Sequence, residues 1–372
     1  MLFPANRIAA LAAGFSLASA QTWTSCNPLT TSCPADPALG MTIDVDFTQG
    51  EVNSFYAGGT PTYDREGVHF SVTKSGDAPQ LNSAFYIMFG RVEVTLKAAP
   101  GVGIVSSVVL QSDDLDEIDL EWLGGRSDEV QLNYFGKGIV SSYNRGTVSK
   151  VEDTQGTWHT YTIDWTSERI IWAVDGTELR SLAYDDAETN QYPQSPMQVK
   201  FGSWSGGDPA NQAGTIAWAG GTTDYTQGPY TMLVQSIVVA DYSTGTEYNY
   251  TDNSGSWQSI DAIGGAVNGR ISDSSKITIT STVRASEVAT ATIPVGIATD
   301  SNTPTYTQTG WPWVAGASPT RGAIPSGWYM TPEGKIMRVS AASLAQAPNL
   351  SILLAAGLCS WLLGAVATAT GF

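Results

Sequence analysis

The chain has 372 residues, and its 35 acidic against 18 basic side chains give it a formal net charge of −17. A chain this acidic repels the phosphates of nucleic acids and the surface of an anionic membrane, so neither is expected as a direct partner. A neutral polysaccharide meets no such repulsion, and 12 tryptophans and 15 tyrosines supply flat rings that suit sugar faces, although they suit ordinary β cores equally.

The N-terminus has the pattern of a secretory signal peptide. Arg7 precedes an apolar run over residues 8–17, and Ala18-Ser19-Ala20 supplies the small residues of a cleavage site. The apolar run is too short to span a bilayer. We therefore expect residues 1–20 to be removed by cleavage after Ala20, and the protein to be secreted.

Two cysteines, Cys26 and Cys33, follow the expected cleavage site. In an oxidising compartment a close pair predicts a disulfide, which would close a small loop near the new N-terminus. Two free thiols or a metal-binding pair are the alternatives, but no nearby histidine or second cysteine pair completes a metal site. We expect neither a metal ion nor a cofactor in this protein.

Short alternating runs separated by Gly, Asp and Ser fill the chain from about Met41 to Asp241. Residues 158–165 alternate cleanly, and residues 170–174 lead into Asp175-Gly176, which is typical of a hairpin turn. No long stretch has apolar residues at helical spacing. The sequence predicts an all-β domain over residues 21–245, built of two packed antiparallel sheets.

Ser, Thr, Gly and Pro dominate after residue 245. Such a composition buries too little apolar surface to offset chain entropy, so residues 246–340 are expected to form a largely disordered stalk. The sequon at Asn249 predicts N-glycosylation.

An apolar tail without charged residues closes the chain. Small residues at 340–343, a short polar spacer and the terminal apolar run match a glycolipid-anchor signal, here residues 341–372. A transmembrane helix is the alternative, although no cytoplasmic Lys or Arg follows it. With the anchor, Cys359 is lost on maturation and the protein is held at the outer face of the cell membrane and in the wall.

Carboxylates and aliphatic residues alternate in the run from Glu117 to Glu121. On a strand, Glu117, Asp119 and Glu121 share one face, while Ile118, Leu120 and Trp122 face the opposite way, so Trp122 is expected in the core. Three like charges in a row repel one another, and a structural role gives no reason to accept that cost. A solvated edge strand is the plain alternative, but the opposite face is strongly apolar. We therefore expect a functional site here.

Cleavage of a glycosidic bond uses two carboxyl groups in different roles. In retaining enzymes these groups lie roughly 5–5.5 Å apart, whereas residues four apart on a flat strand have Cα atoms about 13 Å apart. The strand must therefore curve or the side chains must lean inward, which predicts a concave sheet that forms a cleft. Neighbouring carboxylates raise each other's pKa and keep one of the outer two protonated as an acid.

This run resembles the Glu-x-Asp-x-Glu signature of glycoside hydrolase family 16, in the form found in fungal cell-wall Crh-type transglycosylases. The matching segments span roughly residues 21–245 and occur in order: 116–124, 131–138, 158–165, 172–176 and 197–204. The cysteine loop, the stalk and the anchor signal also match the layout of that group.

The resemblance implies a concanavalin-like β-jelly-roll with a substrate cleft across its concave sheet. It implies Glu117 as the nucleophile, Asp119 as its helper and Glu121 as the general acid/base that also contacts substrate. It further implies an enzyme that cleaves chitin and passes the glycosyl part to β-glucan or chitin. The absence of an extra residue between Asp119 and Glu121 separates the chain from the bulged, laminarinase-like branch.

Four further residues are candidates for sugar binding. Lys200 and Trp204 lie in a matching segment, and their spacing places both on one face of a strand. Thr215 occupies the position of a further donor contact, and Trp218 would form the cleft wall. Each tryptophan could equally pack in the core, and Lys200 could be an ordinary surface lysine.

Two other functions compete with transglycosylation. An endo-hydrolase of β-glucan or chitin would use the same three carboxylates, and cleft geometry decides whether water or sugar accepts the glycosyl group. A lectin-like wall-binding protein could share the fold, but binding alone does not require the complete trio. A monomer is expected in every case.

Overall fold

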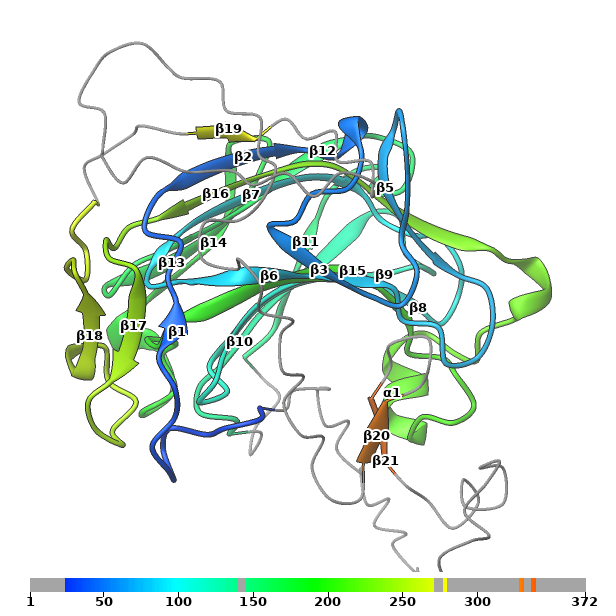
Figure 1. Ribbon diagram of the computed structural model, residues 1–372. Helices are drawn as coiled ribbons and strands as arrows, with labels where there is room; N and C mark the ends of the chain where they lie inside the picture. Colours follow the sequence, from blue (N-terminus) through cyan, green and yellow to red (C-terminus); the bar gives the residue numbers. More distant parts are fainter. Residues whose placement is uncertain (1–23, 140–144, 271–276, 280–327, 331–335, 339–372) are drawn as a thin grey trace, which may run out of the picture.

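A computed structural model describes residues 24–139, 145–270, 277–279, 328–330 and 336–338 of the chain (Figure 1). The expected signal peptide and anchor signal lie outside the described residues, as does most of the expected stalk. In the part of the chain that is described, no helix is both long enough and apolar enough to cross a membrane.

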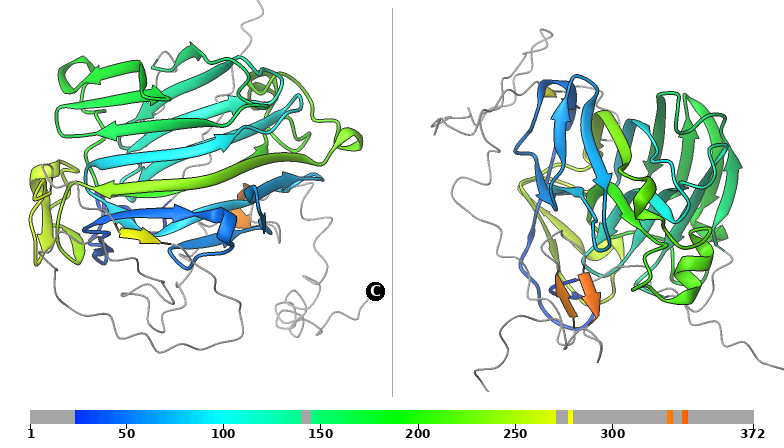
Figure 2. Two further views of the ribbon diagram at one scale, coloured as in Figure 1. Left: turned by 90° about the horizontal axis from the view of Figure 1, so that it is seen from above. Right: turned by 90° about the vertical axis from the view of Figure 1, so that its right-hand side faces the viewer.

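Two large sheets form the body of the molecule, and the second arches over the first (Figures 1 and 2). The first has seven strands, in the spatial order β11 (Thr147–Lys150), β10 (Glu129–Phe135), β9 (Glu117–Leu123), β8 (Ile104–Ser112), β15 (Met197–Ser205), β6 (Gln80–Ile87) and β3 (Phe55–Gly58). All neighbours in it are antiparallel.

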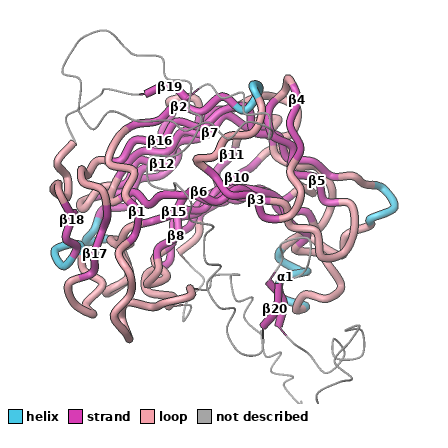
Figure 3. Tube along the Cα trace, viewed as in Figure 1, coloured by secondary structure: helices cyan, strands magenta, loops and turns pink. Residues whose placement is uncertain are grey.

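The second sheet has nine strands. Its main path is β14 (Thr177–Ala183), β13 (Arg169–Val174), β12 (His159–Trp165), β7 (Gly90–Lys97), β16 (Tyr230–Asp241), β2 (Thr42–Asp46) and β19 (Ile277–Ile279), with β5 (Gly67–Val72) on β16 and β4 (Thr62–Asp64) on β5. Only β19 pairs in parallel. The all-β prediction is confirmed, as Figure 3 shows.

Within the described ranges, helical segments are few and short. They are η1 (Phe47–Gln49), η2 (Tyr184–Asp186), α1 (Ala213–Trp218), η3 (Tyr225–Gln227) and η4 (Trp257–Ser259). A separate hairpin pairs β20 (Trp328–Met330) with β21 (Ile336–Arg338).

The core fills the space between the two large sheets. Alternation of apolar and polar residues along the strands produces this core. On β7, for example, Val92, Val94 and Leu96 are buried while the residues between them are at least partly exposed. Trp165 and Trp172 enter the same core from β12 and β13 and are fully buried. Each large apolar side chain buried in this way contributes about 1.5–3 kcal/mol to stability.

The folded region extends past residue 245, where the sequence predicted the start of the stalk. A third sheet joins β1 (Asp36–Pro37), β17 (Glu247–Tyr250) and β18 (Ile260–Ile263). Tyr248 of β17 is fully buried in the main core. The sequence prediction missed this extension because its strands are short and its polar loops resemble a linker. The chain is described without a gap as far as Arg270, and β19 beyond it still pairs with β2.

Asp241 fastens this extension to the body. Its carboxylate accepts hydrogen bonds from the backbone of Gly40 (2.9 Å) and Met88 (3.1 Å) and from the hydroxyl of Tyr248 (2.5 Å). Burial raises the pKa of Asp241 to about 7, against the hydrogen bonds that lower it. Asn249 lies beside Tyr248 on β17, and its glycosylation stays a prediction.

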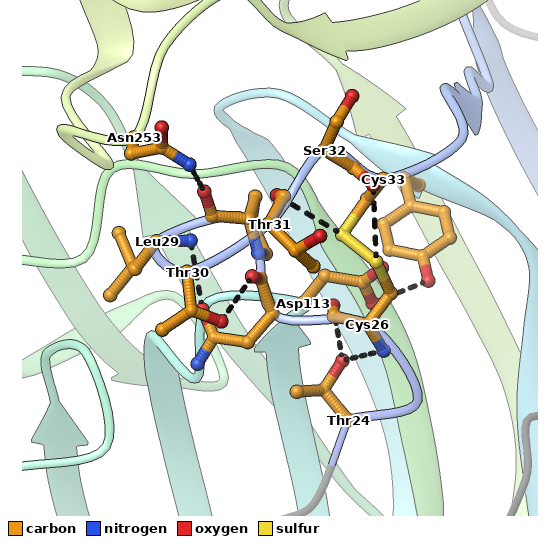
Figure 4. The surroundings of a disulfide bond; sticks show 12 residues. Thr24, Cys26, Leu29, Thr30, Thr31, Ser32, Cys33, Asp113 and Asn253 are labelled. Atoms are coloured by element: carbon orange, nitrogen blue, oxygen red, sulfur yellow. Dashed lines mark hydrogen bonds between the residues drawn. A yellow bond between two sulfur atoms is a disulfide. The ribbon is translucent and has the colours of Figure 1, made fainter.

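The predicted disulfide between Cys26 and Cys33 is present, with 5.8 Å between the two Cα atoms. Figure 4 shows its loop beside Asp113 and Asn253. The side-chain amide of Asn253 donates to the carbonyl of Pro28 inside the disulfide loop. The N-terminal loop and the extension after residue 245 are therefore in direct contact.

Replacing Tyr248 with Ala should destabilise the domain by about 3–5 kcal/mol, because it removes a fully buried aromatic ring and the hydroxyl bound to Asp241. Ile263→Ala is the matched control, since this side chain of the same small sheet is 39% exposed, and it should change stability by no more than about 0.5 kcal/mol. Chemical denaturation measures both. Equal, small effects would show that the extension is not part of the cooperative fold.

Candidate active site

Strand β9 carries the acidic run, and its two faces differ as the alternation predicted. Ile118, Leu120 and Trp122 are buried in the core between the sheets. The opposite face carries Glu117, Asp119 and Glu121. Trp122 is thus a core residue, as expected.

The first two carboxylates are recessed rather than solvated. Glu117 is 4% exposed and Asp119 is 3% exposed, whereas Glu121 is half-buried. The side-chain hydrogen bond between Glu117 and Asp119 links the two groups. The solvated-edge alternative is wrong, because β9 lies between β8 and β10 and two of its carboxylates are almost inaccessible.

The backbone of β9 is held by its two neighbouring strands and by the opposite sheet. Its pairing with β8 and with β10 runs without a register shift, so no bulge interrupts the acidic run. From the opposite sheet, the indole of Trp172 donates a hydrogen bond of 3.1 Å to the carbonyl of Asp119. The three carboxylates are therefore fixed to a rigid, regular strand.

A buried ionic cluster fixes the turn just before Glu117. The ammonium of Lys137 lies 3.2 Å from Asp114 and 3.1 Å from Asp116, and both carboxylates are fully buried. The backbone amides of Lys137 (2.9 Å) and Gln194 (2.7 Å) also donate to Asp116. Breaking such a buried pair typically costs about 3–5 kcal/mol. The position of the adjacent Glu117 is therefore strongly constrained.

Gln111 and Lys200 adjoin Glu117 on the β8 side. Gln111 is the cross-strand partner of Glu117, and its amide donates to the Glu117 carboxylate over 3.4 Å. Lys200 on β15 donates to the carbonyl oxygen of the same glutamine. Burial lowers the pKa of Lys200, and the carboxylates of Asp113 and Glu117 raise it. Lys200 thus faces the acidic run and is not an ordinary surface lysine.

Arg145 adjoins Glu117 on the β10 side. Its guanidinium lies 4.6 Å from the centre of the Phe135 ring, and Phe135 is the cross-strand partner of Glu117. The guanidinium donates to the side chain of Gln191 and, over 2.8 Å, to the carbonyl of Ile139. The Arg145 side chain is almost fully buried, so its charge is screened little by solvent.

These neighbours shift the pKa values of the three carboxyl groups to different extents. Burial raises the pKa of Glu117 to about 7, while Asp119, Lys200, Gln111 and Arg145 lower it. The pKa of Glu121 rises to about 8 through burial and the charge of Glu117, without a cation among the causes. Burial and both glutamates raise the pKa of Asp119 well above its usual range. Charge is therefore most easily held at Glu117, and protons at Asp119 and Glu121.

Two tryptophans flank the Glu121 end of the run. Trp204 on β15 and Trp218 on α1 stack with ring centres 6.1 Å apart and 27° between planes. The indole of Trp218 donates 3.0 Å to Gln131, the cross-strand partner of Glu121. Both rings are half-buried and lie outside the main core, where they pack against a small separate cluster of Val105, Leu123 and Ala219.

Thr215 lies one turn before Trp218 on α1 and is half-buried. Lys200 pairs with Val109 of β8, which pairs with Asp119, and Trp204 pairs with Val105, which pairs with Leu123. Leu123 lies two residues after Glu121 and so on the face of the carboxylate trio, and Lys200 and Trp204 therefore share that face. The structure thus brings Lys200, Trp204 and Trp218 to the same side of the sheet as the trio.

Gln111 and Arg145 were not predicted from the sequence. Gln111 could have been found from the hairpin, since positions 111 and 117 flank the turn at Ser112–Asp116 symmetrically. Arg145 precedes β11, and no local pattern marks it. Among the described residues, no cluster of His, Cys, Asp and Glu could hold a metal ion.

Comparison with known proteins accounts for this arrangement. Residues 48–220 match the model of glycosyl hydrolases family 16. A Crh-like protein 4 of Botryotinia fuckeliana is 58% identical over 333 residues, covering 87% of this chain and 88% of the relative. The chain belongs to glycosyl hydrolase family 16. The Crh-like protein 4 of Aspergillus fumigatus is 50% identical, covering 88% of this chain and 74% of the relative.

A solved family 16 structure has the same fold. The Crh5 transglycosylase in complex with NAG is 49% identical, with a TM-score of 0.63, and the match covers 64% of this chain and 99% of that one. The expected jelly-roll sandwich is thereby confirmed, and the chain is a member of the fungal Crh-like proteins within family 16.

The raised pKa values predict that the domain is more stable in acid than in mild alkali. Asp116, Glu117 and Glu121 titrate at about 7, 7 and 8 when folded, against about 4 when unfolded. The folded state therefore binds more protons, and its stability falls as the pH rises from about 4 through 8. Aspartates with lowered pKa, such as Asp64 and Asp128, lie on the surface and offset little.

We expect the thermal midpoint to fall by roughly 5 °C or more between pH 5 and pH 8. Glu121→Gln removes one titrating group and should flatten this dependence. Scanning calorimetry of both proteins measures it. A midpoint that rises over this range, or an equal slope in the variant, would contradict the assigned pKa directions.

Proposed function

We propose that this protein is a retaining transglycosylase that cleaves chitin and transfers the glycosyl part to β-glucan or chitin, cross-linking polysaccharides of the cell wall. The observation that carries the proposal is the uninterrupted Glu117–Asp119–Glu121 face of β9, in a chain 49% identical to the Crh5 transglycosylase solved with NAG. A transfer assay with chitin and β-glucan oligosaccharides distinguishes this function from the hydrolase and lectin alternatives.

In the first step the carboxylate of Glu117 attacks the anomeric carbon of the donor sugar. A covalent glycosyl-enzyme forms as the glycosidic bond breaks, and Glu121 gives its proton to the leaving oxygen. In the second step Glu121, now ionised, takes a proton from the acceptor hydroxyl. The acceptor oxygen then bonds to the anomeric carbon and Glu117 leaves as a carboxylate.

The electrostatic surroundings support this division of roles. A nucleophile must be ionised, and Lys200, Gln111 and Arg145 all favour the charged form of Glu117. A general acid must hold its proton near neutral pH, which a pKa of about 8 allows for Glu121. The raised pKa of Asp119 favours a protonated carboxyl group, which hydrogen-bonds to Glu117 and orients it.

Sugar binding is assigned to the residues beside Glu121. Trp204 and Trp218 offer a pair of half-buried rings for stacking, and Glu121, Lys200 and Thr215 offer polar contacts. A donor chain across the outer face of the seven-stranded sheet would pass between these rings and the carboxylates. We propose that this path is the substrate cleft expected from the sequence.

The setting of the enzyme is part of the proposal. The signal peptide sends the chain out of the cell, and the lipid anchor holds it at the outer face of the membrane, close to the wall polymers. Glycosylation at Asn249 fits the same route. The stalk would separate the folded domain from the membrane.

Transfer is tested with chitin oligosaccharides and a fluorescent β-glucan oligosaccharide. The protein should form a labelled hybrid product, and Glu117→Gln should reduce its formation by roughly 10³-fold or more, because the covalent intermediate cannot form. Mass spectrometry of the products measures both. Shortened oligosaccharides without a hybrid would indicate a hydrolase, and binding without turnover would indicate a lectin.

Arg145→Gln should shift the acidic limb of the pH profile of kcat/KM to higher pH. The loss of a buried positive charge raises the pKa of Glu117, so the nucleophile becomes ionised only at higher pH. Arg145→Lys keeps the charge and should keep most of the profile. An unshifted limb in Arg145→Gln would show that this arginine does not influence Glu117.

A further inference from the structure

A pocket of about 390 Å³ opens at the end of the sandwich where β10 finishes. Segments far apart in the sequence meet there: one follows β10, one connects β14 to β15, and one connects β17 to β18, the pair at the left of Figure 1. None of the residues proposed for catalysis or sugar binding lines it. Its volume lies within the range of about 300–1,000 Å³ that is usual for small-molecule sites.

Exposed apolar side chains gather in this pocket. Tyr184 is 46% exposed and Ile139 is 36% exposed, and they are two of the five large apolar side chains that the described residues expose. Tyr184 is also the only aromatic among those five. Its ring packs 5.1 Å from that of the buried Tyr192, which gives it a fixed support. A supported, half-exposed ring is a platform for stacking.

Uncharged hydrogen-bonding groups surround this platform. They comprise the amides of Asn190, Gln194 and Gln258 and the hydroxyls of Ser254 and Ser256. Gln194 is more than nine-tenths buried, and its carbonyl oxygen accepts from the backbone of Trp257 over 3.2 Å, so its orientation is fixed.

The pocket offers no uncompensated charge. Its one ionised side chain, Lys137, is paired with the buried carboxylates of Asp114 and Asp116. An anionic ligand would have to compete with two carboxylates, and a cationic ligand would face an ammonium. The lining suits a neutral ligand that has both an apolar face and several hydroxyl or amide groups.

We propose that this pocket is a second polysaccharide-binding site, which takes a neutral pyranose chain and is separate from the carboxylates of β9. The ring of Tyr184 stacks on one sugar, Ile139 covers its apolar edge, and the amides and hydroxyls bind its polar groups. Holding a polymer at two places on one domain raises its effective concentration at the catalytic face. The choice of chitin and β-glucan as probes rests on the proposed function.

Binding is measured in the full chain carrying Glu117→Gln, so that turnover does not remove the ligand. Depletion from solution by insoluble chitin and by insoluble β-1,3-glucan is compared for Tyr184→Ala, Ile139→Ala and the matched control Ile263→Ala, which is 39% exposed outside the pocket. The two pocket variants should bind one polymer ~5- to 10-fold more weakly, and the control should not change. The polymer affected identifies the ligand. Pocket variants that bind both polymers like the control would overturn the proposal.

A kinetic measurement separates the pocket from the catalytic face. With Glu117 intact, Tyr184→Ala should keep kcat/KM on short soluble oligosaccharides within about twofold while losing activity on the insoluble polymer. An equal loss on both substrates would place Tyr184 in the catalytic groove and overturn the separate site. Persistent activity of Glu117→Gln would refute the proposed mechanism instead, without affecting the binding result.

Discussion

Mutual repulsion among the three carboxylates of β9 is the constraint on which the rest of the structure depends. Glu117 and Asp119 are nearly inaccessible to solvent, so water does little to screen their charges. The strand tolerates them because its backbone is fixed by two unshifted ladders and by the indole of Trp172, and because the raised pKa of Asp119 favours its neutral form. A flexible strand would relieve the repulsion by moving the groups apart. The chemistry therefore requires a rigid sheet, because only a rigid sheet keeps the carboxyl groups close together.

The same constraint distributes the charges around the trio. Lys200 is linked to Glu117 by hydrogen bonds through Gln111, and the guanidinium of Arg145 lies over the ring of Phe135, the cross-strand partner of Glu117. The pKa of Glu121, in contrast, is raised by burial and by the charge of Glu117. Two glutamates on one strand face thus become different reagents through their neighbours alone. In the proposed mechanism, Glu117 is the nucleophile and Glu121 the acid because Lys200 and Arg145 lie at the Glu117 end of β9.

The sequence predicted what depends on local alternation. The carboxylate face of β9, the core position of Trp122 and the shared face of Lys200 and Trp204 all follow from a period of two, and the structure shows each of them. It did not predict what depends on contacts between distant segments. Arg145 stands outside any strand, and the extension after residue 245 consists of short strands between polar loops. The burial of Tyr248 and the hydrogen bond from Asn253 to the disulfide loop show that this extension belongs to the fold.

That extension has a role in placing the nucleophile. The N-terminal disulfide loop contacts Asn253, and nearby Gly255 has a φ of +63° and stands so close to the side chains of Asp114, Leu29 and Lys137 that a Cβ atom would not fit. The backbone amide of Trp257 donates to the side-chain oxygen of Gln194, and the backbone amide of Gln194 donates to Asp116, the residue directly before Glu117. A continuous chain of contacts therefore runs from the disulfide to the nucleophile. The segments at both ends of the folded domain are then parts of the catalytic unit, because the turn that sets Glu117 is built against them.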